Sequence, residues 1–235
     1  MSQAMPVGEP GIEHLITEDD EPVDNVFSEK QQRLLTEPLY SSWSGPGEGG
    51  RKFLACANVG VFNVPRNNPV VPDMFLSLDV ETHQDLWAKE HRSYFVWEFG
   101  KPPDVVVEIV SNKVGGETGE KKIKYARMRV GYYIIFDPEL QLSDDLLTIY
   151  RLDGLSYRRH DSMRLPEINL GLTLWEGEFE DAPDTWLRWT DENGDLILTG
   201  KERAEKERAE KEAAQQRAEK LAAMLREIGR DPDLI

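Results

Sequence analysis

Glu108 is an acidic residue inside an apolar run of the sequence, "PPDVVVEIVS" (102–111). Side chains alternate along a strand, so Glu108 would share one face with Val106 and Val110. If this strand is central, the carboxylate is removed from water, and an unpaired charge there is costly. The carboxylate must therefore be neutralised, paired or bound to a metal ion. Taken alone, Glu108 favours a structural salt bridge or a protonated glutamate.

A second acid and a lysine shift that balance. Asp73 interrupts another apolar segment, "VVPDMFL" (70–76). In the helical stretch "GEKKIKYARMRV" (119–130), Lys121 and Tyr125 are four residues apart and would lie on one stripe of a helix. We therefore expect Lys121, rather than Lys124, to point towards the sheet. A second apolar stripe on the same helix leaves that orientation open.

Two carboxylates and a lysine at the ends of neighbouring strands suit metal-assisted hydrolysis of a phosphodiester. Carboxylates are hard oxygen ligands for Mg²⁺, which keeps several of its waters. The metal lowers the pKa of a bound water, and a lysine can position that water or the phosphate. These residues predict Asp73 and Glu108 as ligands of Mg²⁺ (or Mn²⁺) and Lys121 as the catalytic lysine.

The elements that would position these residues predict a mixed α/β domain. A strand over 104–110, a helix, and a strand over 131–138 predict a parallel βαβ crossover. Five further features are expected from apolar patterns and turn residues: a helix over 27–35 with Ser28 as its N-cap, a hairpin joining 53–64 to 70–78, an aromatic strand over 93–99, and hairpins about Asp153-Gly154 and Asn193-Gly194.

The composition changes along the chain and predicts three parts. Residues 1–26 read as a mobile acidic tail, 27–200 as the core, and 201–235 as a charged helix of strong helix formers. In that helix Ala218, Leu221, Leu225 and Ile228 are spaced like a short coiled-coil seam. A solvated helix with a docked end and a helix for dimerisation or partner binding are both open, and the latter predicts a homodimer or other oligomer.

Charge and cysteine content limit the function classes. The net charge of −16, from 28 basic and 44 acidic residues, argues against broad non-specific binding to nucleic acid but not against a local site. No apolar run is long enough to span a membrane, and the acidic N-terminus has no apolar signal-peptide core. Cys56 is the only cysteine. We expect a cytoplasmic protein without membrane attachment.

Several other residues are candidates for the site. Asp104 shares the face of Glu108 and is either an extra ligand or part of a strand-entry turn. Ser111 is a strand-end residue or a site hydrogen-bonding group. The basic cluster "YRRH" (157–160) and the pair Trp186 and Trp189 are expected to be structural rather than contacts to nucleic acid.

The segments "VVPDMFL", "PPDVVVEIVS" and "GEKKIKYARMRVGYYIIFDP", in this order, resemble a known family. They resemble the Uma-two-type restriction endonucleases of the PD-(D/E)XK nuclease superfamily, in particular cyanobacterial-type members that end in a charged helix. The resemblance implies a restriction-endonuclease-like core, with a mixed central sheet flanked by helices, and a Mg²⁺-dependent site acting on DNA. It places Asp73 at the family's "PD" aspartate, Glu108 at the second acid, and Lys121 at the lysine four residues before the tyrosine.

The sequence also departs from the superfamily pattern. The lysine expected two residues after the second acid is replaced by Val110, so the lysine must come from the helix, with Lys113 and Lys122 as alternatives to Lys121. Glu117 stands where many relatives have aspartate. A second hypothesis is therefore a catalytically silent member that acts through its C-terminal helix as an oligomerisation or partner-binding protein.

Overall fold

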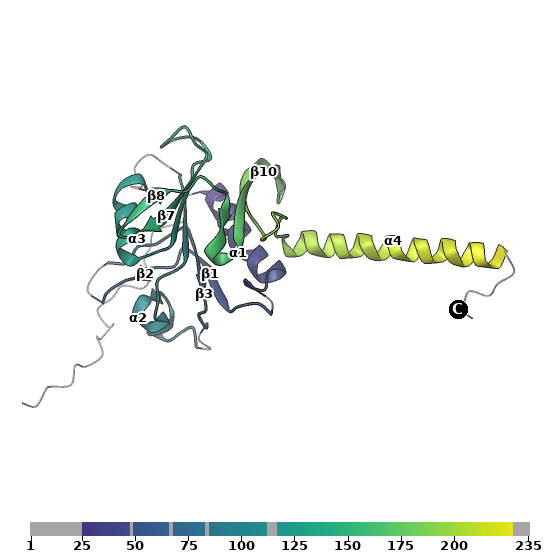
Figure 1. Cartoon of the computed structure of the whole chain (residues 1–235), viewed down its shortest axis with the longest axis horizontal. Coiled ribbons are helices and arrows are strands. Elements are labelled where there is room, and N and C mark those ends of the chain that lie inside the picture. The colour runs from purple at the N-terminus through teal and green to yellow at the C-terminus, as the bar shows by residue number, and fades with distance from the viewer. Residues whose placement is uncertain (1–24, 48, 66–67, 83–84, 112–116, 228–235) are drawn as a thin grey trace, which may run out of the picture. The chain divides into compact units, whose positions relative to one another are not determined.

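A mixed central sheet of six strands forms the frame of the structure (Figure 1). The structure is a computed structural model that describes residues 25–47, 49–65, 68–82, 85–111 and 117–227. The strand order is β1-β3-β5-β6-β7-β8, in which only β5 and β6 run parallel to each other. The bounds are β1 Phe53–Ala57, β3 Met74–Leu78, β5 Val105–Ile109, β6 Tyr132–Phe136, β7 Leu147–Asp153 and β8 Ser156–Arg159.

The crossover between β5 and β6 confirms the predicted βαβ unit. It contains a π-helical turn, η2 (Glu117–Lys121), which leads directly into α3 (Lys122–Met128). Parallel neighbours need such a connection because a tight hairpin cannot join them. All five residues of β5 and all five of β6 are buried, as expected for strands covered on both faces.

One face of the sheet packs against α1 (Val26–Ser42) and a three-stranded sheet. The helix is capped by Asn25, whose side chain accepts a hydrogen bond from the Ser28 amide at 2.8 Å. The prediction of Ser28 as the N-cap was therefore wrong, because the helix begins three residues earlier and Ser28 lies buried within it.

The three-stranded sheet consists of β9 (Arg164–Leu165), β10 (Leu170–Phe179) and β11 (Ala182–Thr190), with η3 (Pro166–Ile168) between the first two. The hairpin of β10 and β11 was not predicted, since its turn, Glu180-Asp181, contains no glycine. Both turn residues nevertheless have positive φ, 48° and 63°. The hairpin expected about Asn193-Gly194 is reduced to one bridge between Thr190 and Leu196.

The other face packs against α3 and a small two-stranded sheet of β2 (Val61–Phe62) and β4 (Tyr94–Phe95). The strand predicted over 93–99 is mostly wrong, because the chain turns into α2 (Val96–Phe99) after β4. The rings of Tyr94 and Phe99 stack at 4.3 Å between centroids. Residues five apart in an extended strand lie about 17 Å apart, so this contact requires the helical turn. The short η1 (Lys89–His91) precedes β4.

The two faces divide the apolar core. Met74, Leu76, Val105 and Val107 point towards α1 and β9–β11, whereas Phe75, Val106 and Tyr133 point towards α3. Glu108 follows the alternation onto the α3 side. The hairpin of β7 and β8 about Asp153-Gly154 is present as predicted.

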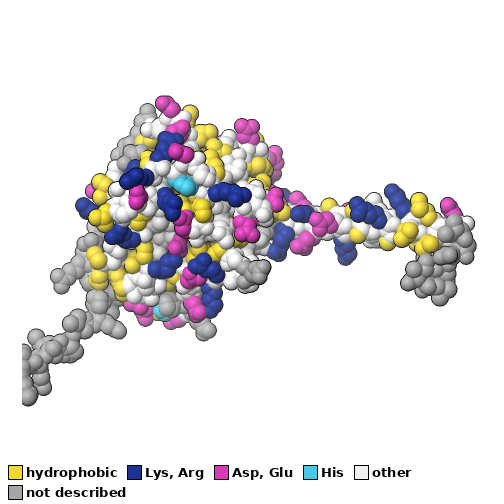
Figure 2. Space-filling model, viewed as in Figure 1, with side chains coloured by type: hydrophobic (Ala, Val, Ile, Leu, Met, Phe, Trp, Pro, Cys, Tyr) yellow, Lys and Arg dark blue, Asp and Glu magenta, His cyan; other side chains and the backbone are white. Residues whose placement is uncertain are grey.

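A second compact unit begins at Leu198, after the first ends at Ile197. It contains α4 (Gly200–Glu227), a 28-residue helix with no buried side chain. Thr199 and Glu202 form a capping box at its start: the Glu202 amide donates to Thr199 Oγ1 at 3.2 Å, and the Thr199 amide donates to Glu202 Oε2 at 2.8 Å. Basic and acidic side chains alternate along α4 (Figure 2). Among the described residues, no helix has the length and apolar character to cross a membrane.

Gln31 gives a test of how α1 is joined to the three-stranded sheet. Its amide donates to the Leu187 carbonyl at 2.8 Å and accepts from the Leu187 amide at 2.9 Å, in a fully buried position. We predict that Gln31→Ala lowers the free energy of unfolding by about 2–5 kcal/mol, because two buried backbone groups lose their partners. Urea denaturation measures this, with Glu37→Ala on the exposed side of α1 as the control. Equal effects of the two variants would contradict it.

Candidate active site

The strand register brings the two predicted carboxylates together. Met74 pairs with Val107 and Phe75 with Val106 across β3 and β5, so the next residue pair in this register is Asp73 and Glu108. Cross-strand partners project from the same face of a sheet. The Asp73 carboxylate is also held directly against β5, since its Oδ2 accepts a hydrogen bond from the Ile109 amide at 2.7 Å.

Glu108 is fully buried, and α3 with its preceding turn supplies both of its hydrogen-bond donors. Lys121 Nζ lies 2.8 Å from Glu108 Oε2, and the Tyr125 hydroxyl donates to Oε1 at 2.7 Å. The two donors are four residues apart, as their spacing predicts for one stripe of a helix. The Lys121 side chain remains 28% exposed, whereas that of Glu108 is 1% exposed. The lysine thus connects the buried carboxylate to the solvent side.

Burial raises the pKa of Glu108 to about 8. The positive charge of Lys121 opposes this shift, whereas the negative charge of Asp73 adds to it. Burial and the nearby Glu108 charge also raise the pKa of Tyr125 well above its ordinary range, so the tyrosine stays a neutral donor. The repulsion between the two carboxylates is the electrostatic condition that a divalent cation relieves.

Two polar residues missed by the sequence reasoning complete the surroundings of Asp73. Gln32, on α1, donates to Asp73 Oδ1 at 3.1 Å. Asn58, directly after β1, donates to Gln32 Oε1 at 2.9 Å and accepts from its Nε2 at 3.3 Å. Asn58 has a positive φ of 53°, a conformation that asparagine tolerates better than most residues. The only sequence signal was a glutamine pair, Gln31 and Gln32, beside the apolar positions of a helix.

The alternative lysines are placed differently. Lys122 lies over the ring of Tyr150, with its Nζ 3.4 Å from the ring centroid. Lys124 forms an ion pair with Glu120 at 3.8 Å. Lys113 lies outside the described residues. Of the lysines described on this crossover, Lys121 is therefore the one that reaches Glu108.

Asp104 does not belong to the site. It lies before β5, four residues and about 13 Å along the strand from Glu108. Its Oδ2 accepts from the Leu78 amide at 2.7 Å and from Lys101 Nζ at 2.6 Å. The hypothesis of an extra ligand at Asp104 was wrong, and the strand-entry interpretation is confirmed.

The remaining candidates have structural surroundings. Trp186 and Trp189 are each 1% exposed and pack in the core. In the "YRRH" cluster, Arg158 pairs with Asp153 at 2.6 Å and Arg159 with Asp145 at 2.8 Å. Ser111 lies at the site end of the sheet, where its carbonyl accepts from Gln141 at 3.5 Å.

The donor set fits Mg²⁺ and does not fit a metal that needs many protein ligands. Within the described part of the chain, no group of three or more His, Cys, Asp or Glu side chains could hold a metal ion. Mg²⁺ is commonly bound through only one or two carboxylates and keeps its remaining waters. Asp73 and Glu108, which the strand register brings to one face, are the two carboxylates that would hold it.

The pKa of Glu108 predicts how the metal-free protein responds to pH. A carboxyl whose pKa is higher in the folded state holds its proton more tightly there, so stability falls as pH rises from about 4.5 to about 8. We expect the stability of Glu108→Gln to lack this pH dependence. The free energy of unfolding of the variant, relative to that of the wild type, should therefore increase by a few kcal/mol between pH 5 and pH 8. Urea denaturation in the presence of EDTA measures both proteins. Parallel pH profiles would contradict the expectation.

Comparison with known proteins gives one positive result. The family Uma2, described as "Putative restriction endonuclease", matches residues 21–175. That span covers more than half of the chain and includes Asp73, Glu108, Lys121 and Tyr125. None of the curated proteins compared matches the chain. The mixed sheet and its flanking helices are consistent with a restriction-endonuclease-like fold, and the chain belongs to the Uma2 family of restriction endonucleases.

Proposed function

We propose that this protein is a Mg²⁺-dependent endonuclease that hydrolyses DNA phosphodiester bonds. Membership of a restriction endonuclease family supports a nuclease-type function. The observation that carries the proposal is the register of β3 and β5, which sets Asp73 opposite Glu108, with Lys121 Nζ 2.8 Å from the Glu108 carboxylate. In this proposal Asp73 and Glu108 hold the metal and Lys121 is the catalytic lysine.

Each side chain has a distinct role in the proposed reaction. The bound metal would supply a water of lowered pKa and stabilise the developing negative charge. Tyr125 fixes the orientation of the Glu108 carboxylate by donating to its Oε1. The Ile109 amide and Gln32 fix the two oxygens of Asp73 in the same way. Because these donors lie on packed elements, the two carboxylates are oriented before any ligand binds.

Lys121 is suited to meet the substrate. Its side chain begins at the end of the π-helical turn, contacts Glu108, and is still 28% exposed. Asp73 is also partly exposed, whereas Glu108 is not. A phosphodiester would therefore approach from the side of Asp73 and Lys121. There the ammonium group can position the scissile phosphate or the attacking water. It can also stabilise the negative charge that develops on the phosphate in the transition state.

Plasmid cleavage with Mg²⁺ tests the residue assignment. We expect Glu108→Gln and Lys121→Met to lower the cleavage rate by about 100-fold or more, because the first removes a proposed metal ligand and the second removes the positive charge that meets the phosphate. Lys122→Met is the matched control, since Lys122 is the next lysine but lies over Tyr150. It should cleave within about threefold of the wild type. Metal-dependent cleavage that survives Glu108→Gln would contradict the assignment.

A second candidate function concerns α4, which we propose to be a self-association helix. Leu221 and Met224 are 60% and 63% exposed, although both are large apolar residues. Leu221 and Leu225 are four apart and share one face, which a second copy of the helix would cover. Opposite charges spaced along α4 would allow the paired helices to avoid like-charge contacts.

Sedimentation velocity tests this candidate in the full chain. We expect the wild type to dimerise with increasing concentration, and the double variant L221E/L225E to remain a monomer because two charges would enter the seam. The double variant Q216E/A223E adds the same charges on the opposite side of the helix and should dimerise as the wild type does. If all three proteins are monomers, α4 is not a self-association helix.

A further inference from the structure

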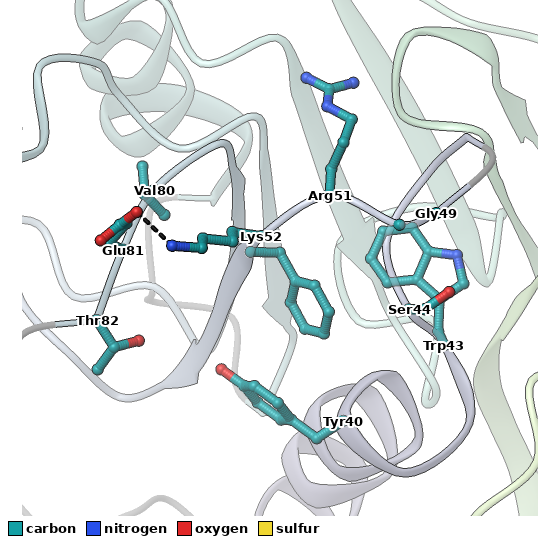
Figure 3. Close-up of a pocket in the computed structure, with 11 residues that line it drawn as sticks. Tyr40, Trp43, Ser44, Gly49, Arg51, Lys52, Val80, Glu81 and Thr82 are labelled. Atoms are coloured by element: carbon teal, nitrogen blue, oxygen red, sulfur yellow. Dashed lines mark hydrogen bonds and ion pairs between the residues drawn. The ribbon is translucent and has the colours of Figure 1, made fainter.

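A hollow at the end of α1 contains exposed aromatic and basic groups that the proposed catalytic site does not use. It has a volume of about 570 Å³, within the range of small-ligand sites. We call it the Tyr40 groove. The side chains that line it include Tyr40, Trp43, Phe53, Lys52 and Glu81. Figure 3 shows Tyr40 and Trp43 bordering the hollow from the helix side, with the Lys52–Glu81 ion pair across from them.

The aromatic rings of the groove form a fixed platform. The centroid of the Phe53 ring lies 5.1 Å from that of Tyr40 and 5.0 Å from that of Trp43. The Tyr40 hydroxyl donates to the Ala55 carbonyl at 3.1 Å and accepts from the Ala55 amide at 2.9 Å. These two hydrogen bonds hold the ring at the edge strand β1 while Tyr40 stays 56% exposed. An exposed ring that is held in place loses little conformational freedom when a flat ligand stacks on it.

The polar groups at the rim suit the edge of a base and a phosphate. Lys52 and Glu81 have side chains that are 66% and 75% exposed, so solvent screens their ion pair strongly and the pair contributes little to stability. A phosphate can therefore compete for Lys52 at little cost. Arg51 points away from the two rings (Figure 3) and pairs with Asp79.

Two glycines near Trp43 have backbone conformations that other residues rarely adopt. Gly45 and Gly50 have positive φ, 87° and 73°. A Cβ on Gly50 would lie 2.2 Å from the Ser44 carbonyl oxygen, and one on Gly45 would lie 2.1 Å from the Arg51 carbonyl oxygen. Only glycine fits at these two positions.

The groove and the carboxylate pair lie along the same two elements. On α1, Gln32 contacts Asp73 and Tyr40 lies in the groove, eight residues or about 12 Å further on. On β1, Phe53 lies in the groove and Asn58, which contacts Gln32, follows the other end about 17 Å away. These separations from Gln32 and Asn58 correspond to about four or five nucleotides at the duplex rise. Phe53 and Trp43 pack on the α1 face of the sheet and Glu108 lies on the α3 face, so a strand joining the two places would pass over the edge strand β1.

We propose that the Tyr40 groove binds an unpaired nucleobase, with its adjoining phosphate, of the strand that enters the carboxylate site. A paired base is stacked inside its duplex and cannot reach such a platform unless it is extruded. The preferred substrate is therefore DNA with a single-stranded region about four or five nucleotides from the cleaved bond. This inference rests on the proposed function for the identity of the strand, but binding to the groove requires neither metal nor cleavage.

Fluorescence anisotropy in EDTA measures this binding without cleavage. The probes are a fluorescein-labelled oligodeoxythymidine, an abasic strand of the same length, and the matching duplex. We expect the thymidine strand to bind more tightly than the abasic strand. Trp43→Ala should weaken binding of the thymidine strand by roughly five- to 100-fold, the range for loss of one stacked base, and Trp43→Phe should restore most of it.

Two controls separate the groove from general effects. Trp87 is 82% exposed but lies outside the groove, so Trp87→Ala should bind as the wild type does. Lys52 is exposed and unimportant for packing, so Lys52→Ala tests the phosphate contact in a protein that still folds, and it should weaken the thymidine and abasic strands alike. Equal binding of the thymidine and abasic strands, or equal effects of Trp43→Ala and Trp87→Ala, would overturn the proposal.

The failure of this inference is distinguishable from failure of the proposed function. If the wild type cleaves DNA and Trp43→Ala binds the thymidine strand normally, the groove assignment is wrong and the nuclease assignment stands. If the wild type does not cleave but its strand binding depends on Trp43, the nuclease assignment fails and the groove assignment stands.

Discussion

The Glu108 carboxylate lies fully buried in a strand covered on both faces, and the surrounding structure offsets the cost of that burial. Lys121 and Tyr125 provide the two hydrogen bonds, and both come from the crossover that makes β5 and β6 parallel. Asp73 does not neutralise the Glu108 carboxylate. Its own negative charge raises the pKa of Glu108 further. A structural salt bridge would not need a second carboxylate at this position. The arrangement is instead typical of a site that tolerates local instability in order to hold a ligand.

The position of Asp73 shows how the fold on both sides of the sheet contributes to one site. Gln32 comes from α1, which packs on the face opposite to α3, and it reaches Asp73 at the end of the sheet. Asn58 closes the arrangement from the end of β1. Elements that are distant in the sequence therefore meet at the end of β3 and β5 where the carboxylates lie. Because both faces of the sheet are packed, the orientation of the two carboxylates is fixed more precisely than it would be on surface loops.

Local patterns in the sequence predicted much of this arrangement, because they follow from the geometry of single elements. Strand alternation put Glu108 on the face of Val106 and Val110, and the four-residue spacing put Lys121 beside Tyr125. The register that sets Asp73 opposite Glu108 is a pairing between strands, and no local pattern determines it. The roles of Gln32 and Asn58, the β10–β11 hairpin and the Tyr40 groove likewise depend on contacts between segments far apart in the chain. The residue types suggested that Asp73 and Glu108 act together, and the family resemblance supported the same grouping.

We propose that Asp73 and Glu108 hold one divalent cation between them. Isothermal titration calorimetry of Mg²⁺ and Mn²⁺ into the wild type, Asp73→Asn and Glu108→Gln tests it most directly, because it needs no DNA and no cleavage. We expect one binding site in the wild type and its loss in either variant, since the two neighbouring carboxylates would act as one site. Undiminished binding to both variants, or no binding to the wild type, would contradict it.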